Sequence, residues 1–173
     1  MKGGVRWGKV GDMPTQVGRL PGHRDRKGEW SEHVLLGEFR HSLDSKGRVF
    51  LPSRWREELG EVVVITQGLD RCLFLLARPR FEELAERFDR LSLENPDARA
   101  YTRIFFSKAS EESLDGQGRI TIPANLRSQA GLGKELVLAG VSRRAEIWDR
   151  SLYDTYQGNV QEQYEEIAGK LQL

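Results

Sequence analysis

The feature that most constrains the fold is an internal repeat of a ten-residue motif. Residues 43–52 read Leu-Asp-Ser-Lys-Gly-Arg-Val-Phe-Leu-Pro, and residues 114–123 read Leu-Asp-Gly-Gln-Gly-Arg-Ile-Thr-Ile-Pro. Beyond the motif, Arg56 falls opposite Arg127 at the same offset. Self-similarity at a fixed offset is the signature of a duplicated structural unit. The chain is therefore expected to contain two copies of one small unit.

Each copy carries the same order of predicted secondary structure. A strand leads into a tight turn, a second strand ends at a proline, and a short helical segment, two strands and a helix follow. The short helical segment and the two strands after it are expected at 53–59, 62–66 and 72–76, and again at 124–130, 135–139 and 145–148. Apolar stripes indicate the closing helices, formed by Phe81, Leu84, Ala85, Phe88 and Leu91 and by Leu152, Tyr156, Val160, Tyr164, Ile167 and Leu171. The expected fold class is mainly β with flanking helices (α+β), ending in a C-terminal amphipathic helix.

The repeat divides the chain into segments. They are an N-terminal extension at 1–33, a first unit at 34–92, a linking helix at 93–108 and a second unit with the C-terminal helix at 109–173. The extension is rich in Gly, Lys and Arg, so it is expected to be disordered, or to precede a true translation start at Val34. Asn95 and Pro96 are typical of a helix cap and a first helical residue. Units this small are expected to share a core with a partner.

Composition narrows the possible functions. The net charge is only +1, with +3 in residues 1–33 and −2 in the remainder, so any DNA binding must depend on local charge. No apolar run is long enough to span a membrane. The histidines show no metal-ligand spacing, and the single Cys72 fits a buried thiol in a reducing cytoplasm. The sequence therefore predicts a cytoplasmic protein that is not an enzyme and holds no metal or other cofactor.

Each copy of the motif predicts a tight turn between two strands. Asp44 and Asp115 can accept hydrogen bonds from the backbone N–H groups that follow them. Gly47 and Gly118 can supply the positive φ that such a turn needs. These four residues are therefore expected to form the two turns.

The aspartate and the arginine of each motif allow three interpretations. Arg48 and Arg119 can form local ion pairs with the turn aspartates, which are common and contribute little to stability. Alternatively, each can contact a phosphate or the O6/N7 edge of guanine in a major groove. In a third interpretation, Asp44 and Asp115 form a carboxylate pair for hydrolysis. The arginine beside each aspartate disfavours this last role, because a nearby cation favours the ionised carboxylate.

These residues resemble the MraZ family of transcriptional regulators. The resemblance rests on the doubled motif and on the flanking runs at 36–39, 54–59, 127–132, 137–140 and 146–149, and it covers Val34 to the C-terminus. It implies two tandem swapped-hairpin β-barrel units of the SpoVT/AbrB type, related by pseudo-two-fold symmetry. It also implies a ring of identical subunits on the nucleoid. Such a ring would bind short direct repeats of double-stranded DNA upstream of the division and cell-wall gene cluster, as a repressor.

The resemblance also implies which residues contact DNA. By motif position these are Lys46 and Arg48 in the first copy and Arg119 in the second. Arg40 and His41, on the strand that enters the first turn, are further candidates. Lys46 is a second cation in the first copy, whereas the second copy has the neutral Gln117 at that position.

A second binding function stays open. SpoVT/AbrB-type units also occur in antitoxins, which bind DNA with the barrel and a toxin with an extension. Those chains are usually a single unit with a disordered tail. Two units and a terminal helix in this chain favour the regulator.

Overall fold

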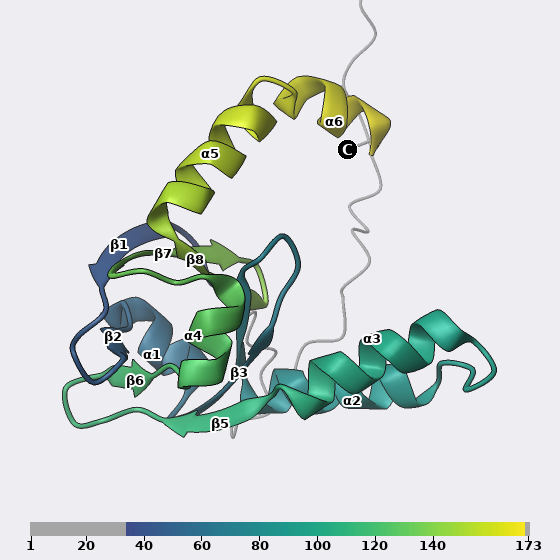
Figure 1. Cartoon of the computed structure of the whole chain (residues 1–173), viewed down its shortest axis with the longest axis horizontal. Helices are drawn as coiled ribbons and strands as arrows, with labels where there is room; N and C mark the ends of the chain where they lie inside the picture. Colours follow the sequence, from purple (N-terminus) through teal and green to yellow (C-terminus); the bar gives the residue numbers. More distant parts are fainter. Residues whose placement is uncertain (1–33, 172–173) are drawn as a thin grey trace, which may run out of the picture. The chain divides into compact units, whose positions relative to one another are not determined.

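The computed structural model describes residues 34–171 (Figure 1). The expectations for residues 1–33 lie outside this range. The first copy contains β1 (Glu38–Ser42), β2 (Arg48–Phe50), α1 (Ser53–Leu59), β3 (Val62–Gln67), β4 (Leu73–Ala77) and α2 (Arg78–Asp89). Helix α3 (Pro96–Ser107) leads into the second copy. The second copy contains β5 (Ser110–Ser113), β6 (Arg119–Thr121), α4 (Ala124–Ala130), β7 (Glu135–Val141), β8 (Arg144–Asp149), α5 (Arg150–Gln161) and α6 (Tyr164–Lys170).

The fold is mixed α and β around an antiparallel sheet in which the two copies interleave. The six-stranded sheet has the order β1-β7-β8-β4-β3-β5. Strand β1 of the first copy pairs with β7 of the second, and β5 of the second pairs with β3 of the first. The two short strands β2 and β6 form a ladder of their own. Neither copy therefore forms its sheet without the other.

The sheet is open in the part of the chain that the structure describes. Strands β1 and β5 lie at its two edges, and no ladder joins them. The closed barrels implied by the family resemblance are therefore not found in this strand order. Each edge strand instead turns away into β2 or β6, and these two short strands pair with each other.

The main core lies between the sheet and the β2–β6 ladder. Val49 and Ile120 are direct partners in that ladder, and both are fully buried. Buried side chains from both copies surround them, including Leu51, Trp55, Ile65, Leu73, Leu75, Ile122, Leu126, Leu136, Leu138 and Ile147. Because the copies contribute to one core, we expect them to fold as one unit.

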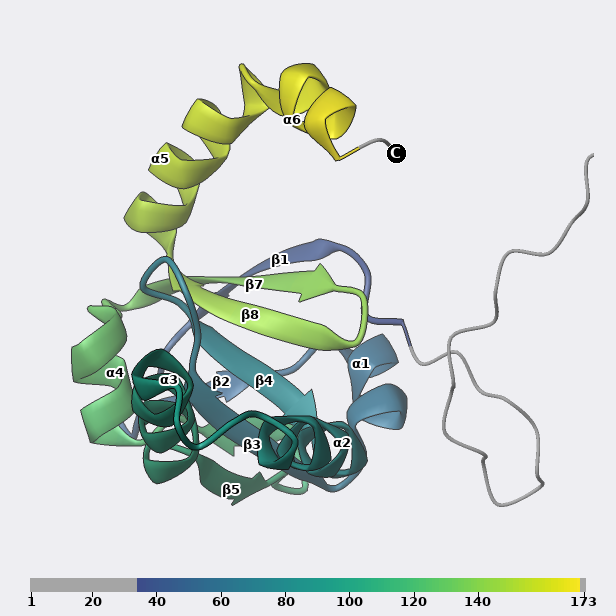
Figure 2. The same ribbon diagram turned by 90° about the vertical axis from the view of Figure 1, so that its right-hand side faces the viewer.

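Helices cover the opposite face of the sheet. Side chains alternate across a strand, so Phe74 and Leu76 point away from the main core into a second apolar cluster. Helices α2 and α3 lie side by side over this cluster (Figures 1 and 2), and Phe88 of α2 packs against Phe105 of α3 with ring centroids 5.2 Å apart. The Asn95 side chain caps α3 by accepting a hydrogen bond from the Asp97 backbone N–H at 2.9 Å.

Two details of the predicted helices are wrong. Helix α2 ends at Asp89, which leaves Leu91 outside it and exposed, because the chain needs a connection before α3 begins at Pro96. The single C-terminal helix is instead divided into α5 and α6. Within the described residues no side chain of α6 is fully buried, so apolar burial does not fix α6 in line with α5. None of the helices in residues 34–171 is long and apolar enough to cross a membrane.

The shared core predicts that both copies lose stability together. Replacing the fully buried side chain in Ile122→Ala removes packing in the second copy and should lower the free energy of unfolding by about 2–5 kcal/mol. Hydrogen exchange should report an equal loss of protection in β3 and β7, because the two strands belong to one cooperative unit. The exposed neighbour provides a control, Thr121→Ala, which should change stability by less than about 0.5 kcal/mol. Loss of protection confined to the second copy would contradict the shared core.

Candidate nucleic-acid interface

The two repeated turns have the same geometry. In the first, Oδ1 of Asp44 accepts hydrogen bonds from the backbone N–H groups of Lys46 and Arg48, both at 2.9 Å. In the second, Oδ1 of Asp115 accepts the equivalent bonds at 2.9 and 3.0 Å. The turn glycines have φ values of +75° at Gly47 and +77° at Gly118. One carboxylate oxygen therefore braces each turn, and a glycine permits its positive φ.

The second carboxylate oxygen of each aspartate binds the arginine that follows the turn. Oδ2 of Asp44 accepts from Nε and Nη2 of Arg48 at 2.8 and 2.7 Å. Oδ2 of Asp115 accepts from the same two atoms of Arg119, both at 2.7 Å. Each aspartate thus both braces its turn and fixes the direction of a guanidinium group.

The β2–β6 ladder places the two turns next to each other. The ladder continues through backbone bonds from Leu51 N–H to the Gly118 carbonyl at 3.0 Å and from Ile122 N–H to the Gly47 carbonyl at 2.8 Å. Across the turns, Nη1 of each arginine lies 3.9 Å from Oδ2 of the other copy's aspartate. The four side chains Asp44, Arg48, Asp115 and Arg119 form one group, which we term the central Asp–Arg cluster.

Both carboxylates of this cluster are held in the ionised form. The hydrogen bonds from the Arg119 side chain and backbone lower the pKa of Asp115 to about 2. The hydrogen bonds from the Arg48 backbone and side chain lower the pKa of Asp44 below its ordinary value. Hydrolysis by a carboxylate pair needs one carboxyl that keeps its proton, so this geometry opposes that role.

Each turn rests on an arginine from the other copy, which sequence reasoning missed. The Arg56 guanidinium lies against Gly118, where an added Cβ would overlap it, while its Nε donates to the Leu51 carbonyl at 2.9 Å. The Arg127 guanidinium lies against Gly47, 2.9 Å from the position of an added Cβ. The buried Nε of Arg127 finds no hydrogen-bond acceptor among residues 34–171. The repeat alignment paired these arginines, but it contained no signal for the turn that each one contacts.

The remaining candidates differ in where they lie. Lys46 is exposed in the first turn, beside the cluster. Arg40 instead pairs with Asp154 of α5 at 2.9 Å, so it is directed to the C-terminal helix and does not join the turns. His41 is half-buried, and its pKa is lowered by burial and by the charge of Arg56, which favours the neutral imidazole.

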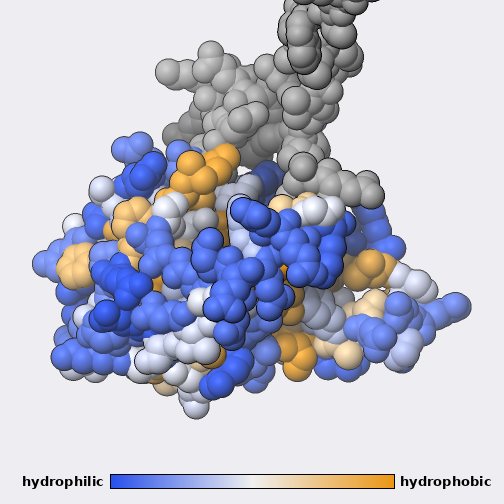
Figure 3. Space-filling view, turned by 90° about the horizontal axis from the view of Figure 1, so that it is seen from above, coloured by the Kyte–Doolittle hydropathy of each residue, from blue (hydrophilic) through white to orange (hydrophobic). Residues whose placement is uncertain are grey.

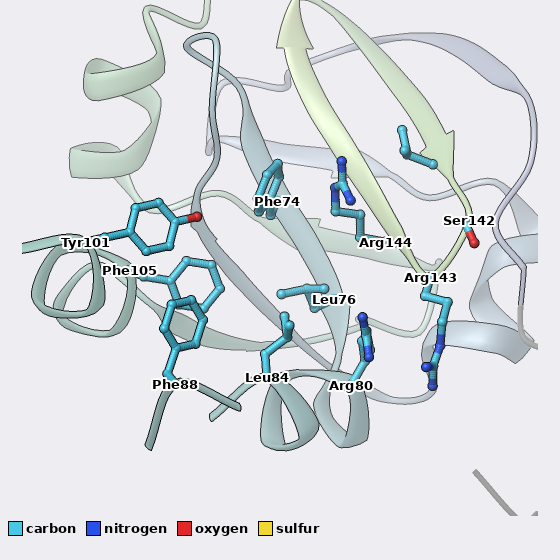
Figure 4. Close-up of a pocket in the computed structure, with 11 residues that line it drawn as sticks. Phe74, Leu76, Arg80, Leu84, Phe88, Tyr101, Phe105, Ser142, Arg143 and Arg144 are labelled. Atoms are coloured by element: carbon cyan, nitrogen blue, oxygen red, sulfur yellow. The ribbon is translucent and has the colours of Figure 1, made fainter. Parts of the chain in front are cut away.

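A hollow lies on the far side of the sheet, between α2, α3 and β8 (Figure 4). Its floor is apolar and its rim carries Arg80, Arg143 and Arg144. These arginines pair with carboxylates, Arg80 with Glu83 at 2.6 Å and Arg144 with Glu146 at 3.0 Å. No group of three or more histidine, cysteine or acidic side chains in residues 34–171 could hold a metal ion. The repeated turns are therefore the stronger candidate site.

The turn glycines give a direct test of this packing. The change Gly118→Ala forces an alanine to φ +77° and pushes its Cβ into the Arg56 guanidinium, so we expect a loss of about 1–3 kcal/mol in unfolding free energy. The control Gly116→Ala lies in the same turn, where an added Cβ meets nothing within 4 Å. Chemical denaturation should show little change for the control, and equal losses in the two variants would contradict the assigned turn geometry.

The ion pair predicts a particular dependence of stability on pH. Because the pKa of Asp115 falls to about 2 on folding, its ionised form stabilises the fold above the unfolded value of about 4. This contribution is lost as the pH falls through that range towards 2. The change Asp115→Asn keeps an oxygen to brace the turn but removes the charge. The difference in unfolding free energy between wild type and variant should therefore shrink between pH 4 and pH 2, whereas parallel curves would contradict the ion pair.

Comparison with known proteins identifies the family. The family model described as "MraZ protein, putative antitoxin-like" matches residues 34–104 and 105–172. The protein named transcriptional regulator MraZ of Carboxydothermus hydrogenoformans is 46% identical over 138 residues, which cover 80% of this chain and 96% of that protein. The proteins of the same name from Moorella thermoacetica and Pelotomaculum thermopropionicum are 47% and 49% identical, with 80% of this chain and 96% and 95% of those proteins covered. The chain belongs to the MraZ family.

Proposed function

We propose that this protein is a sequence-specific DNA-binding transcriptional regulator and that its two repeated turns contact the DNA. The relatives named transcriptional regulator MraZ support the regulatory role and give no indication of an enzyme. The observation that carries the proposal is the convergence of the turns, in which each arginine reaches within 3.9 Å of the other copy's aspartate. Two arginines held close together form a surface that can bind neighbouring phosphates or bases of the DNA.

The aspartates prepare the arginines for binding. A guanidinium has five N–H donors, and the ion pair in each turn engages Nε and one donor of Nη2. Among residues 34–171 no hydrogen bond engages the remaining donors of Arg48 and Arg119, which can bind a phosphate or the O6/N7 edge of guanine. Because each guanidinium is already held in one direction, less side-chain entropy is lost on binding than for an unrestrained arginine.

Local charge supplies the attraction that the net charge lacks. The chain as a whole carries only +1. Two turn arginines, the two arginines packed against the turns and Lys46 nevertheless outnumber the two turn aspartates. Contacts of this kind with phosphates are sequence-independent and weaken steeply with salt.

We also infer that the two units are swapped hairpins related by pseudo-two-fold symmetry. The register of the β2–β6 ladder supports this, because Arg48 pairs with Thr121 and Phe50 with Arg119, around the central pair Val49–Ile120. Exchanging the two copies reproduces the same pairs. The reciprocal bonds from Leu43 N–H to the Lys134 carbonyl and from Leu114 N–H to the Glu61 carbonyl support the same axis.

Assembly into a ring would place several such surfaces on neighbouring DNA sites. The visible face in Figure 3 is mostly hydrophilic, with separate apolar patches among the charged residues. Large apolar side chains stay exposed on α3 and the C-terminal helices, among them Tyr101, Ile104, Tyr156 and Tyr164. Such side chains support contacts between subunits. Linked sites raise the overall affinity by about 10²–10⁴-fold without new kinds of contact.

The family resemblance supports the finer parts of the proposal. These are repression, binding to short direct repeats upstream of the division and cell-wall gene cluster, and a location on the nucleoid. The antitoxin is a second candidate, because the matching family description contains the word "antitoxin-like". A small toxin that co-purifies with the full chain in a fixed ratio would support that candidate.

DNA binding across a salt series tests the proposal. For Arg48→Ala we expect a loss of specific affinity of about 1–3 kcal/mol, because a base contact is removed, and for Lys46→Ala a uniform loss with a salt slope shallower by about 1. The control Arg87→Ala removes the same charge from the exposed side of α2 and should bind like wild type. Fluorescence anisotropy with DNA from the region upstream of the protein's own gene would measure binding by the wild type and the three variants. Wild-type binding without sequence preference at any salt concentration would overturn the proposal.

A further inference from the structure

The geometry of the β2–β6 ladder points to a DNA-binding surface whose two ends are not equivalent. We propose that the two ends of this surface bind DNA differently, so that each subunit sits on its site in one orientation. Lys46 and Phe50 are the residues that set the direction. This inference rests on the proposed function and specifies how that same surface recognises DNA.

The backbone of the surface is the same at both ends. The two aspartate–arginine pairs have matching distances, and the cross-turn distances are 3.9 Å in both directions. Side chains alternate along a strand, so Val49 and Ile120 point into the core while their neighbours point outwards. A surface with identical residues at both ends would therefore accept DNA equally well after a half-turn rotation.

The side chains on this backbone differ between the ends. We define the open end as Lys46, Arg48 and Thr121, and the covered end as Gln117, Arg119 and Phe50. At the open end, Arg48 is paired across the ladder with the small Thr121, and its side chain is 28% exposed. At the covered end, the Arg119 guanidinium carbon lies 5.6 Å from the centre of the Phe50 ring, and the side chain is 19% exposed. The antiparallel pairing thus places the bulkier apolar residue away from the extra cation.

These differences favour different parts of a DNA site. Lys46 adds a phosphate contact that the neutral Gln117 cannot make as an ion pair. Phe50 is 43% exposed on an otherwise polar surface, and a phenyl ring suits the methyl group of thymine. The hydroxyl group of Thr121 instead forms hydrogen bonds with base edges. The two differences distinguish the ends in complementary ways, because Lys46 makes the open end more cationic and Phe50 makes the covered end more apolar.

The orientation of the subunit on its DNA site can be tested with an iron chelate that is attached to the protein and cleaves nearby DNA. The site is a single short sequence that the full-length chain selects from a random duplex pool. The natural Cys72 is 2% exposed, so a new surface thiol can be labelled selectively. The variant Ser45→Cys carries the chelate in the turn at the open end, and Gly116→Cys carries it in the turn at the covered end. Both positions are exposed.

Two double variants make the ends alike. The pair Lys46→Gln and Phe50→Thr gives the first copy the residues of the second. The pair Gln117→Lys and Thr121→Phe does the opposite. It exchanges the Thr121 hydroxyl for a ring but adds a cation, which guards against loss of binding through loss of charge. Each pair is combined with each labelled cysteine.

With the otherwise native surface, each label should cut one flank of the site, with a bias of about tenfold or more, and the two labels should cut opposite flanks. Both double variants should cut the two flanks about equally. Equal cutting by the labelled protein with native ends, together with specific binding, would overturn the orientation and leave the proposed function standing. Selection of no sequence from the pool would instead overturn the proposed function itself.

Discussion

The pairing of β2 with β6 is the contact on which the rest of the structure depends. Two three-residue strands, one from each copy, meet around the fully buried pair Val49–Ile120. This ladder closes the main core beneath the sheet, and its ends carry the two turns. The same few backbone bonds therefore join the copies beside the turns and set the spacing of Arg48 and Arg119. A weakened ladder would reduce stability and alter the proposed DNA-binding surface at the same time.

The sequence predicts the local parts of this fold well. Helices α1 and α4 occupy the predicted ranges, because a proline opens each one and the repeat supplies two independent indications. Burial of Cys72 is also confirmed, and that burial raises the pKa of its thiol to about 12. Residue patterns alone do not predict that β1 pairs with β7 or that β5 pairs with β3. Alternation within a strand indicates which side faces a core, but it does not identify the partner strand.

The sequence predicts the local parts of the candidate site but not its long-range contacts. The motif predicts the turns and the arginines that follow them. It leaves open whether each aspartate braces the turn or binds the arginine. In the structure the aspartate does both. The contacts of Arg56 with Gly118 and of Arg40 with Asp154 join residues far apart in the chain. Such contacts depend on tertiary packing, for which a single sequence gives no periodic signal. The break between α5 and α6 has a related cause, since no residue of α6 is fully buried in the part of the chain that the structure describes.

The covalent link through α3 has an evolutionary consequence. Two interleaved copies on separate chains would have to find each other at cellular concentrations, and both would carry the same residues at every position. On one chain the encounter is intramolecular, so formation of the interleaved sheet does not depend on protein concentration. The link also allows the two copies to differ in sequence, because a mutation in one copy no longer appears in the other. Lys46 opposite Gln117 and Phe50 opposite Thr121 are differences that a homodimer of single units could not encode.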